Sequence, residues 1–344
     1  MKIKVCLLLG ILALFSTSIY AQYSDFKYKR KNHSTEAGYA KAVKQSKYLS
    51  GGLGVSLNSY FGDLTPNQKY LKNSFKTVRP GLTAFGSYNY NGHLFFSADL
   101  LYQRIIGDDF NSETNHSSIS ARKYIRNLSF RNDMFGINLR ANANLFGDPY
   151  EYYMRSDYNV YFFTGISVIY SNPKSKTPEQ SRDGVPFDNA GEWIALRELG
   201  TEGQNHSSTQ DIYSSVQFGI PVGLGFRYKL NHKIDLFAEV ALSYILSDYI
   251  DDVGGNFVDL GIFEDELAKA LSDRSAEEMA MLKNEMRDME FVLQSTDEYT
   301  YESIHDGNSY TVFDGFGHEG APRGGDKNDI ITSLSFKISY IFTK

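Results

Sequence analysis

Residues 333–342 read SLSFKISYIF, and this stretch decides the fold. Side chains alternate between the two faces of a β-strand, so the serines and Lys337 share one face and the large apolar residues share the other. The apolar residues are Leu334, Phe336, Ile338, Tyr340 and Phe342. A strand with these two faces suits lipid on one side and an enclosed polar interior on the other. The same alternation recurs along the chain and predicts an all-β fold, a small antiparallel transmembrane β-barrel.

The start of the chain has the features of a secretory signal peptide. Two lysines precede an apolar run from Val5 to Phe15, and we expect cleavage after Ala21, so that residues 1–21 are removed. The run is too short to cross a membrane as a helix. It contains Cys6, the only cysteine, so the mature protein has no thiol for disulfides, metal binding or catalysis. The expected location is the cell outer membrane.

The composition fits a barrel better than a helical membrane protein. The chain has 25 Tyr, 24 Phe and one Trp, and its mean hydropathy is -0.37. Because only alternate residues of a barrel face lipid, its mean hydropathy stays low. No later apolar run is long enough for a spanning helix. The net charge of -6 argues against nucleic acid as a partner, and outer-membrane lipid is the expected surrounding.

About eight segments show the alternation, which is the smallest number usual for a closed outer-membrane barrel. The first seven contain Leu53, Tyr90, Leu94, Leu139, Phe162, Phe218 and Leu236, and the eighth is the stretch quoted above. The expected barrel domain spans 51–344 and follows a basic periplasmic segment at 22–50.

The lengths of the connections orient the barrel. Short connections lie at Asn91-Gly92, Asp148-Pro149 and Asn231-His232, and long ones span 62–79, 106–127, 171–211 and 250–328. Outer-membrane barrels have short periplasmic turns and long extracellular loops. We therefore expect the long loops outside the cell.

Four charged residues fall on inward faces at one level of the barrel. They are Asp99, Arg140, Glu239 and Lys337. Neighbouring strands make Asp99 with Arg140 and Glu239 with Lys337 the natural ion pairs, in a lumen narrow enough for side chains to fill it. We expect a structural plug that loses stability when one partner is neutralised. A small conduction path is the alternative.

The last outer loop carries a predicted helical insertion at about 260–295. Its first helix is indicated by Phe263, Leu267 and Leu271. Its second helix is indicated by a capping box of Ser275 with Glu278, followed by Met279, Leu282, Met286, Met289 and Leu293. We expect these stripes to pack against each other or against the loops. A methionine-rich surface for another protein is the alternative.

The periplasmic side offers the expected contact surface for a partner protein. The candidate residues are Tyr150, Tyr152, Tyr153 and Arg155 in a turn, and Lys29, Arg30 and Lys31 in the basic segment. For the basic segment the alternatives are a solvated tail or binding to anionic headgroups. For the tyrosines the alternative is an interfacial girdle.

The sequence shows no catalytic, cofactor-binding or metal-binding constellation. The seven histidines lie outside the predicted strands, and no pair has zinc-ligand spacing. A lipid-modifying barrel enzyme that uses His116 with Ser117 and His206 with Ser207 is the alternative from another class. A structural cation is a further alternative for the loop carboxylates Asp108, Asp109, Asp248, Asp251, Asp252 and Asp259, although no calcium-loop pattern is met.

Several strings resemble, in order, the PorG family of outer-membrane barrels. They are RNLSFRND at 126–133, YSNPKSK at 170–176, LGTEGQ at 199–204, FGIPVGLGFRYKL at 218–230, SDYIDDV at 247–253 and LSDRS at 271–275. The likeness covers most of the chain from about Leu53 onward. The basic segment and the methionine-bearing helix are longer than the family requires.

The resemblance implies a non-enzymatic component of the type IX secretion machinery. In that machinery the barrel anchors periplasmic ring proteins, a lipoprotein and its partner, at the outer membrane, without a cofactor or a small-molecule substrate. The residues alone imply only a closed, plugged barrel with large outer loops. A structural barrel or passive pore of unrelated role is the alternative.

Overall fold

The computed structural model describes residues 47–66, 77–112, 117–147, 152–206, 212–325 and 328–342. The expected signal peptide and nearly all of the basic segment lie outside the described residues. The same holds for the candidate residues Tyr150, Lys29, Arg30, Lys31, His116 and Ser207.

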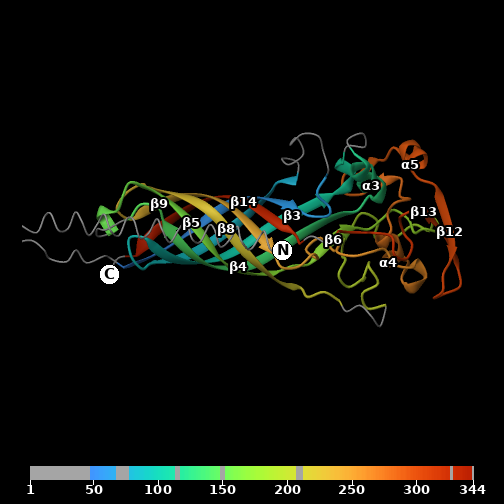
Figure 1. The fold of residues 1–344 in the computed structure, drawn as a ribbon, viewed down its shortest axis with the longest axis horizontal. Coiled ribbons are helices and arrows are strands. Elements are labelled where there is room, and N and C mark those ends of the chain that lie inside the picture. The colour runs from blue at the N-terminus through green and yellow to red at the C-terminus, as the bar shows by residue number, and fades with distance from the viewer. Residues whose placement is uncertain are drawn as a thin grey trace, which may run out of the picture. The chain divides into compact units, whose positions relative to one another are not determined.

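Eight strands form a closed antiparallel β-barrel, which confirms the predicted fold (Figure 1). They are β1 (Tyr48–Phe61), β2 (Arg79–Asn89), β3 (Leu94–Asp108), β4 (Ser129–Asn144), β5 (Tyr158–Tyr170), β8 (Val216–Lys229), β9 (Ile234–Ile245) and β14 (Ile330–Phe342). Each strand pairs with the next one around the barrel, and β14 pairs with β1 from Leu49 opposite Phe342 to Phe61 opposite Ile330. The barrel wall therefore has no open edge.

The outside of the barrel is an apolar belt bounded by tyrosines. In the belt, Leu53, Leu100 and Ile166 are 66%, 60% and 59% exposed. Exposed tyrosines near the periplasmic ends of the strands are Tyr90, Tyr158, Tyr228 and Tyr340, and those near the outer ends are Tyr170 and Tyr244. Exposed aliphatic residues between two aromatic girdles are the surface that an outer-membrane barrel presents to lipid.

Two of the three predicted periplasmic turns owe their tightness to asparagine, and residues 148–151 of the third lie outside the described residues. In the β2–β3 turn, Asn91 Oδ1 accepts the backbone N–H groups of His93 at 2.8 Å and Leu94 at 2.7 Å. Asn231 makes the two equivalent contacts in the β8–β9 turn. An asparagine side chain that satisfies these donors closes a short turn without further residues.

Beyond the other end of the barrel, the outer loops fold into a layer that we call the outer cap, made of the described residues of 62–66, 109–128, 171–215 and 246–329. Its elements are η2 (Asp109–Asn111), α3 (Ser118–Arg126), β6 (Pro173–Lys176), β7 (Trp193–Ala195), η4 (Leu260–Ile262), α4 (Glu266–Ser272), β10 (Met279–Ala280), β11 (Glu285–Met286), α5 (Met289–Ser295), β12 (Glu298–Glu302) and β13 (Ser309–Phe313). One further 3₁₀ turn, η3 (Tyr152–Met154), lies between β4 and β5. Figure 1 shows α3, α4 and α5 gathered at one end of the barrel. None of the described helices is long and apolar enough to span a membrane.

Strand β3 runs further outward than the predicted loop at 106–127 allows, because it reaches Asp108. Strand β4 begins at Ser129, just after the predicted loop. Their outer ends carry Ile105 and Phe130, which are buried among residues of the outer cap. The alternation of lipid-facing side chains therefore ends before the strands do.

The helical insertion differs from the prediction in its second half. Helix α4 buries Leu267 and Leu271 as expected. The predicted second helix, from Ser275 through Leu293, is wrong over its first part, because Met279 and Met286 pair across the short β10–β11 ladder. Their spacing, which resembles that of a helix, arises from two strands that face each other. Only the last part of the predicted helix, α5, is helical.

Buried Arg287 explains why the predicted capping box at Ser275 fails. Its guanidinium donates to the carbonyls of Ser275 and Glu277, which a helix would need for its own hydrogen bonds. Helix α5 begins instead after Asp288, whose carboxylate accepts the N–H of Phe291 at 3.0 Å. An acidic N-cap of this kind is a standard helix start.

Candidate functional site

The barrel interior holds four buried charges that form one network. Both predicted pairs are in contact: Arg140 Nη2 lies 2.9 Å from Asp99 Oδ2, and Lys337 Nζ lies 2.8 Å from Glu239 Oε2. The cross-pairs are also in contact, with Arg140 Nη1 3.0 Å from Glu239 Oε2 and Lys337 Nζ 3.4 Å from Asp99 Oδ2. Two positive and two negative groups thus neutralise each other as a single cluster rather than as two separate pairs.

Aromatic residues of β5 hold this cluster in place. The Tyr161 hydroxyl donates to Glu239 Oε1 at 2.5 Å. The Arg140 guanidinium lies over the Phe163 ring, 4.5 Å from its centroid. Gly225 on β8 lies opposite Tyr161, and a Cβ there would come within 2.1 Å of the tyrosine ring. Glycine on this strand therefore makes room for the side chains that fill the interior.

The interior is filled at two levels. A cavity of about 40 Å³ adjoins the charges and is lined largely by serine, asparagine and threonine side chains, with room for a few water molecules. At the outer ends of the strands, Ile105, Phe130 and Ile331 pack with Leu267 and Leu271 of α4 in one apolar cluster. This arrangement favours the plug over the conduction path.

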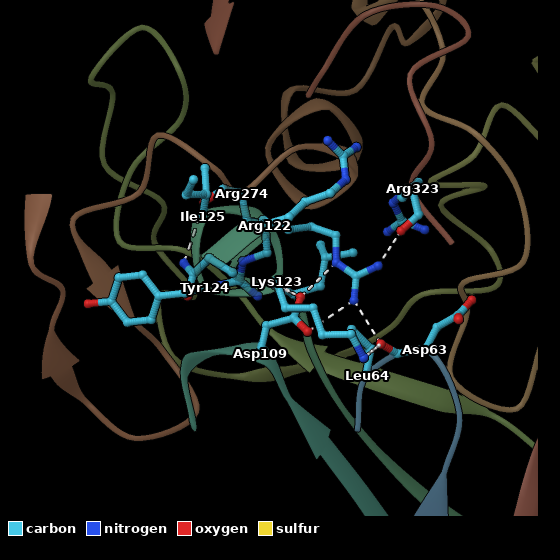
Figure 2. Close-up of polar contacts among 12 residues, drawn as sticks. Asp63, Leu64, Asp109, Arg122, Lys123, Tyr124, Ile125, Arg274 and Arg323 are labelled. Carbon is cyan, nitrogen blue, oxygen red and sulfur yellow. Dashed lines mark hydrogen bonds and ion pairs between the residues drawn. The ribbon is translucent and has the colours of Figure 1, made fainter. Parts of the chain in front are cut away.

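Arginine side chains tie the segments of the outer cap together. Arg126, at the end of α3, donates to both carboxylate oxygens of Asp109 at 2.7 and 3.0 Å. It also donates to the Asp63 carbonyl at 2.9 Å and to the Arg323 carbonyl. Arg323 in turn donates to Glu202 at 3.1 Å. Figure 2 shows Asp63, Asp109 and Arg323 gathered around this helix.

Most of the acidic residues considered for a cation are engaged by the chain itself. Asp109 is paired with Arg126, Asp108 accepts the N–H of Phe110 at 3.1 Å, and Asp259 accepts that of Gly261 at 2.9 Å. In the described part of the chain, no group of three or more His, Cys, Asp or Glu residues is arranged to hold a metal ion. These carboxylates therefore serve the geometry of the loops.

Three further carboxyls near the outer mouth have raised pKa values. Burial raises the pKa of Asp252 to about 6 and the pKa of Asp329 to about 8. Burial and the neighbouring Asp329 carboxyl raise the pKa of Asp251, which accepts the Tyr60 hydroxyl. A buried carboxyl with a raised pKa binds its proton more tightly than the same carboxyl does in water.

Two of the candidate residues for a lipid-modifying enzyme, His206 and Ser117, lie among the described residues. His206 Nε2 lies 3.1 Å from the Leu199 carbonyl, and its ring packs against Phe263 with centroids 5.0 Å apart. Ser117 caps α3, where its hydroxyl accepts the N–H of Ser120 at 3.2 Å. The described residues of this set therefore have structural contacts.

The periplasmic turn corrects one candidate for partner contact. Arg155 is only 2% exposed, because its guanidinium lies 2.6 Å from Asp235 and donates to the His232 carbonyl at 3.0 Å. It therefore clamps the turn and is not available as a surface contact. Tyr153 is 45% exposed, and its ring stands against that of Tyr152 with centroids 5.5 Å apart.

Sequence reasoning missed two residues that complete this interior, Asp235 and Tyr161. The signal was present, because both occupy inward positions in the alternation of their strands. Asp235 lies four residues before Glu239 on β9 and therefore on the same face.

Comparisons with known proteins give similarity of fold alone. No protein-family model matches the chain, and no curated protein matches its sequence. Among solved structures, the chain is similar to Neisserial surface protein A, with 11% identity, a TM-score of 0.35 and coverage of 87% of this chain and 100% of that chain. It is also similar to OprG from Pseudomonas aeruginosa, with 8% identity, a TM-score of 0.32 and coverage of 88% and 98%. A third similar structure is Ail of Yersinia pestis, with 8% identity, a TM-score of 0.29 and coverage of 86% and 97%. No residue role is transferred from these proteins.

Proposed function

We propose that this chain is a non-enzymatic, plugged outer-membrane barrel that anchors other proteins. In the finer form of the proposal, it positions the periplasmic ring components of a type IX secretion machinery, a lipoprotein and its partner, at the outer membrane. The observation that carries the anchoring role is the neutral charge cluster, since a lumen filled in this way leaves the surfaces of the barrel as its working parts.

Support for the finer form comes from where the PorG-like strings fall in the fold. Arg126, Glu202 and Asp252, in three of the strings, belong to the framework that ties the outer cap together. The PorG-like strings thus fall on residues that hold the outer cap together, and this placement supports the proposal. On the periplasmic side, we assign the contact to Tyr152 and Tyr153 and to the basic segment 22–50.

Co-purification tests this role directly. The tagged protein is extracted from its own cells in mild detergent, and periplasmic proteins that co-purify are identified by mass spectrometry. Tyr153→Ala is compared with Tyr299→Ala, because the two tyrosines are 45% and 44% exposed at opposite ends of the molecule. A variant that lacks residues 22–46 tests the basic segment.

We expect the ring lipoprotein to co-purify with the wild type and with Y299A, and at least threefold less of it with Y153A or the deletion. If no periplasmic protein co-purifies in near-stoichiometric amount, the anchoring role is wrong. If a different periplasmic protein co-purifies, the assignment to type IX secretion is wrong. Single-channel steps of the wild-type protein in planar bilayers would contradict the plug.

A further inference from the structure

One segment of the outer cap, residues 288–322, has acidic residues but no lysine or arginine of its own. Residues 288–322 contain eight carboxylates and no lysine or arginine. All eight are exposed: Asp288, Glu290, Asp297, Glu298, Glu302, Asp306, Asp314 and Glu319. A surface of one sign attracts partners of the opposite sign and raises their rate of encounter.

Nearby arginines hydrogen-bond backbone carbonyls, and only Arg122 also interacts electrostatically with one of the eight carboxylates of the described segment, Asp314. Arg287 donates to the carbonyls of Tyr124 and Ile125 at 2.9 Å each. Arg122 donates to the carbonyls of Gly315 at 2.8 Å and Pro322 at 2.7 Å. The cations are thus used to hold loops together, and the anions are left in solvent.

The centre of this acidic surface is the β12–β13 hairpin. One face of the hairpin packs on the cap, with the Tyr301 and Tyr310 rings 5.9 Å apart and Lys269 of α4 lying 5.5 Å from the Tyr310 centroid. On the other face, Glu298 and Glu302 are exposed on either side of Thr300, while Phe313 of β13 is buried against the cap. Their spacing of four residues places the two carboxylates roughly 13 Å apart along the strand.

The outer edge of β12 is free to pair. Asp314 donates its N–H to the Asp297 carbonyl, and Ser303 donates its N–H to the Asn308 carbonyl, both at 2.8 Å. Asp297 and Ser303 thus direct their backbone groups toward β13, and residues that do so alternate along an antiparallel strand with residues that do not. The N–H and C=O groups of Glu298, Thr300 and Glu302 therefore point away from β13. Among the described strands, only β13 pairs with β12, and Figure 1 shows β12 on the outside of the hairpin.

We propose that this edge binds an extended, lysine- or arginine-bearing segment of another polypeptide outside the cell, by antiparallel strand addition. The backbone edge supplies donors and acceptors for a new strand, and alternate side chains of that strand fall on the face of Glu298 and Glu302. A basic residue at those positions meets a carboxylate. The site lies on the opposite side of the membrane from the periplasmic contact and does not depend on it.

A second copy of the chain does not fit this edge. Antiparallel pairing of two β12 strands centred on Thr300 would set Glu298 of each copy against Glu302 of the other, and like charges directly opposite are destabilising. The carboxylates therefore act against self-pairing and favour a basic strand.

Binding of a labelled peptide to the full-length protein in lipid nanodiscs tests the proposal. The probe is Lys-Thr-Lys-Thr-Lys-Thr-Lys, measured by fluorescence anisotropy at low salt. Two matched peptides carry methylated backbone nitrogens, one at the lysines and one at the threonines, and keep the same charge. In antiparallel addition the lysine N–H groups bond to β12 and the threonine N–H groups point away. We expect lysine methylation to weaken binding at least tenfold and threonine methylation to change it less than twofold.

Variants of the protein test the same edge. Thr300→Pro removes an outward N–H, whereas Thr300→Val keeps that N–H and removes only the hydroxyl. E298Q/E302Q removes the two edge charges, and E278Q/E285Q removes two exposed charges elsewhere on the outer cap. We expect T300P and E298Q/E302Q to weaken binding at least tenfold, with T300V and E278Q/E285Q within twofold of wild type. Equal binding of the three peptides, equal loss for both methylated peptides, or equal loss in both charge variants would overturn the proposal.

Discussion

Replacing Glu239 by glutamine should destabilise the barrel more than replacing Glu239 and Lys337 together. Glu239 receives hydrogen bonds from Arg140 at 3.0 and 3.4 Å and from Tyr161 at 2.5 Å, and it lies 2.8 Å from the Lys337 ammonium. Glutamine keeps the shape of the side chain but removes its charge. The cluster is then left with one excess positive charge in a buried site.

The size of the effect follows from charge balance. Removing one partner of a buried ion pair costs about 3–5 kcal/mol, and we expect a loss in this range for E239Q and for K337M. The double variant E239Q/K337M keeps Arg140 beside Asp99 and leaves the interior neutral. Because replacing a whole buried pair is often close to neutral, we expect the double variant to lose only about 1–2 kcal/mol.

Unfolding by urea in phospholipid vesicles measures these differences, with the heat-dependent shift in gel mobility as the readout of the folded barrel. At about 2 kcal/mol per M urea, the single variants should lower the midpoint by about 1.5–2.5 M. Lys233→Met is the control, because Lys233 is an exposed lysine of the periplasmic turn. Its free energy of unfolding should change by less than about 0.5 kcal/mol.

Two results would refute this reasoning. If E239Q unfolds at the wild-type midpoint and conducts ions in planar bilayers, the charges line a path and do not form a plug. If the loss in E239Q/K337M equals the sum of the losses in the single variants, charge balance does not govern the cluster.

Three further predictions concern packing, the outer cap and pH. Gly225→Val should fail to give the heat-shifted barrel form, because its side chain would enter the space of the Tyr161 ring, whereas Gly86→Val, with nothing within 4 Å of its Cβ, should fold. Arg287→Met leaves four carbonyls without their donor and should destabilise the outer cap by about 3 kcal/mol or more. Limited proteolysis should cut the cap of this variant, while the barrel keeps its heat-dependent shift in gel mobility. A cap that resists the protease would contradict the prediction. The raised pKa values of Asp251 and Asp329, the latter to about 8, mean that the folded cap binds protons more tightly than the unfolded chain, so its stability should fall as pH rises from about 4 to about 8. After correction for the intrinsic rate, amide hydrogen exchange of the cap should therefore be slower at pH 5 than at pH 8. Asp329→Asn should reduce this difference. Equal corrected exchange rates at the two pH values would contradict the prediction.

The barrel could be predicted from the sequence because lipid imposes a local rule. Every second residue of a spanning strand must be apolar, and this requirement is visible in residues such as Leu53 and Phe336 without knowledge of the rest of the fold. The inward charges follow from the same alternation. Sequence reasoning identified the four members of the cluster, but it could not show that Arg140 and Lys337 each contact both carboxylates, because that depends on strands across the lumen.

The outer cap could not be predicted in the same way, because its structure depends on contacts between distant loops. The spacing of Met279 and Met286 fits a helix as well as a hairpin, and buried Arg287 selects the hairpin by binding loop carbonyls. Helix α3 was missed although its caps are visible in the sequence as Ser117 and Asn127. Its buried apolar residues are adjacent in sequence and give no periodic stripe.

The place of Lys337 on the last strand has a consequence for how the barrel closes. Until β14 is in position, Asp99 and Glu239 face a single arginine, and the unfinished wall encloses an excess negative charge. A one-residue slip of β14 would turn the ammonium of Lys337 outward into hydrocarbon, which costs about 2–4 kcal/mol at the bilayer midplane. The final strand thus disfavours its own one-residue misalignment, because that slip would leave the fourth charge outside.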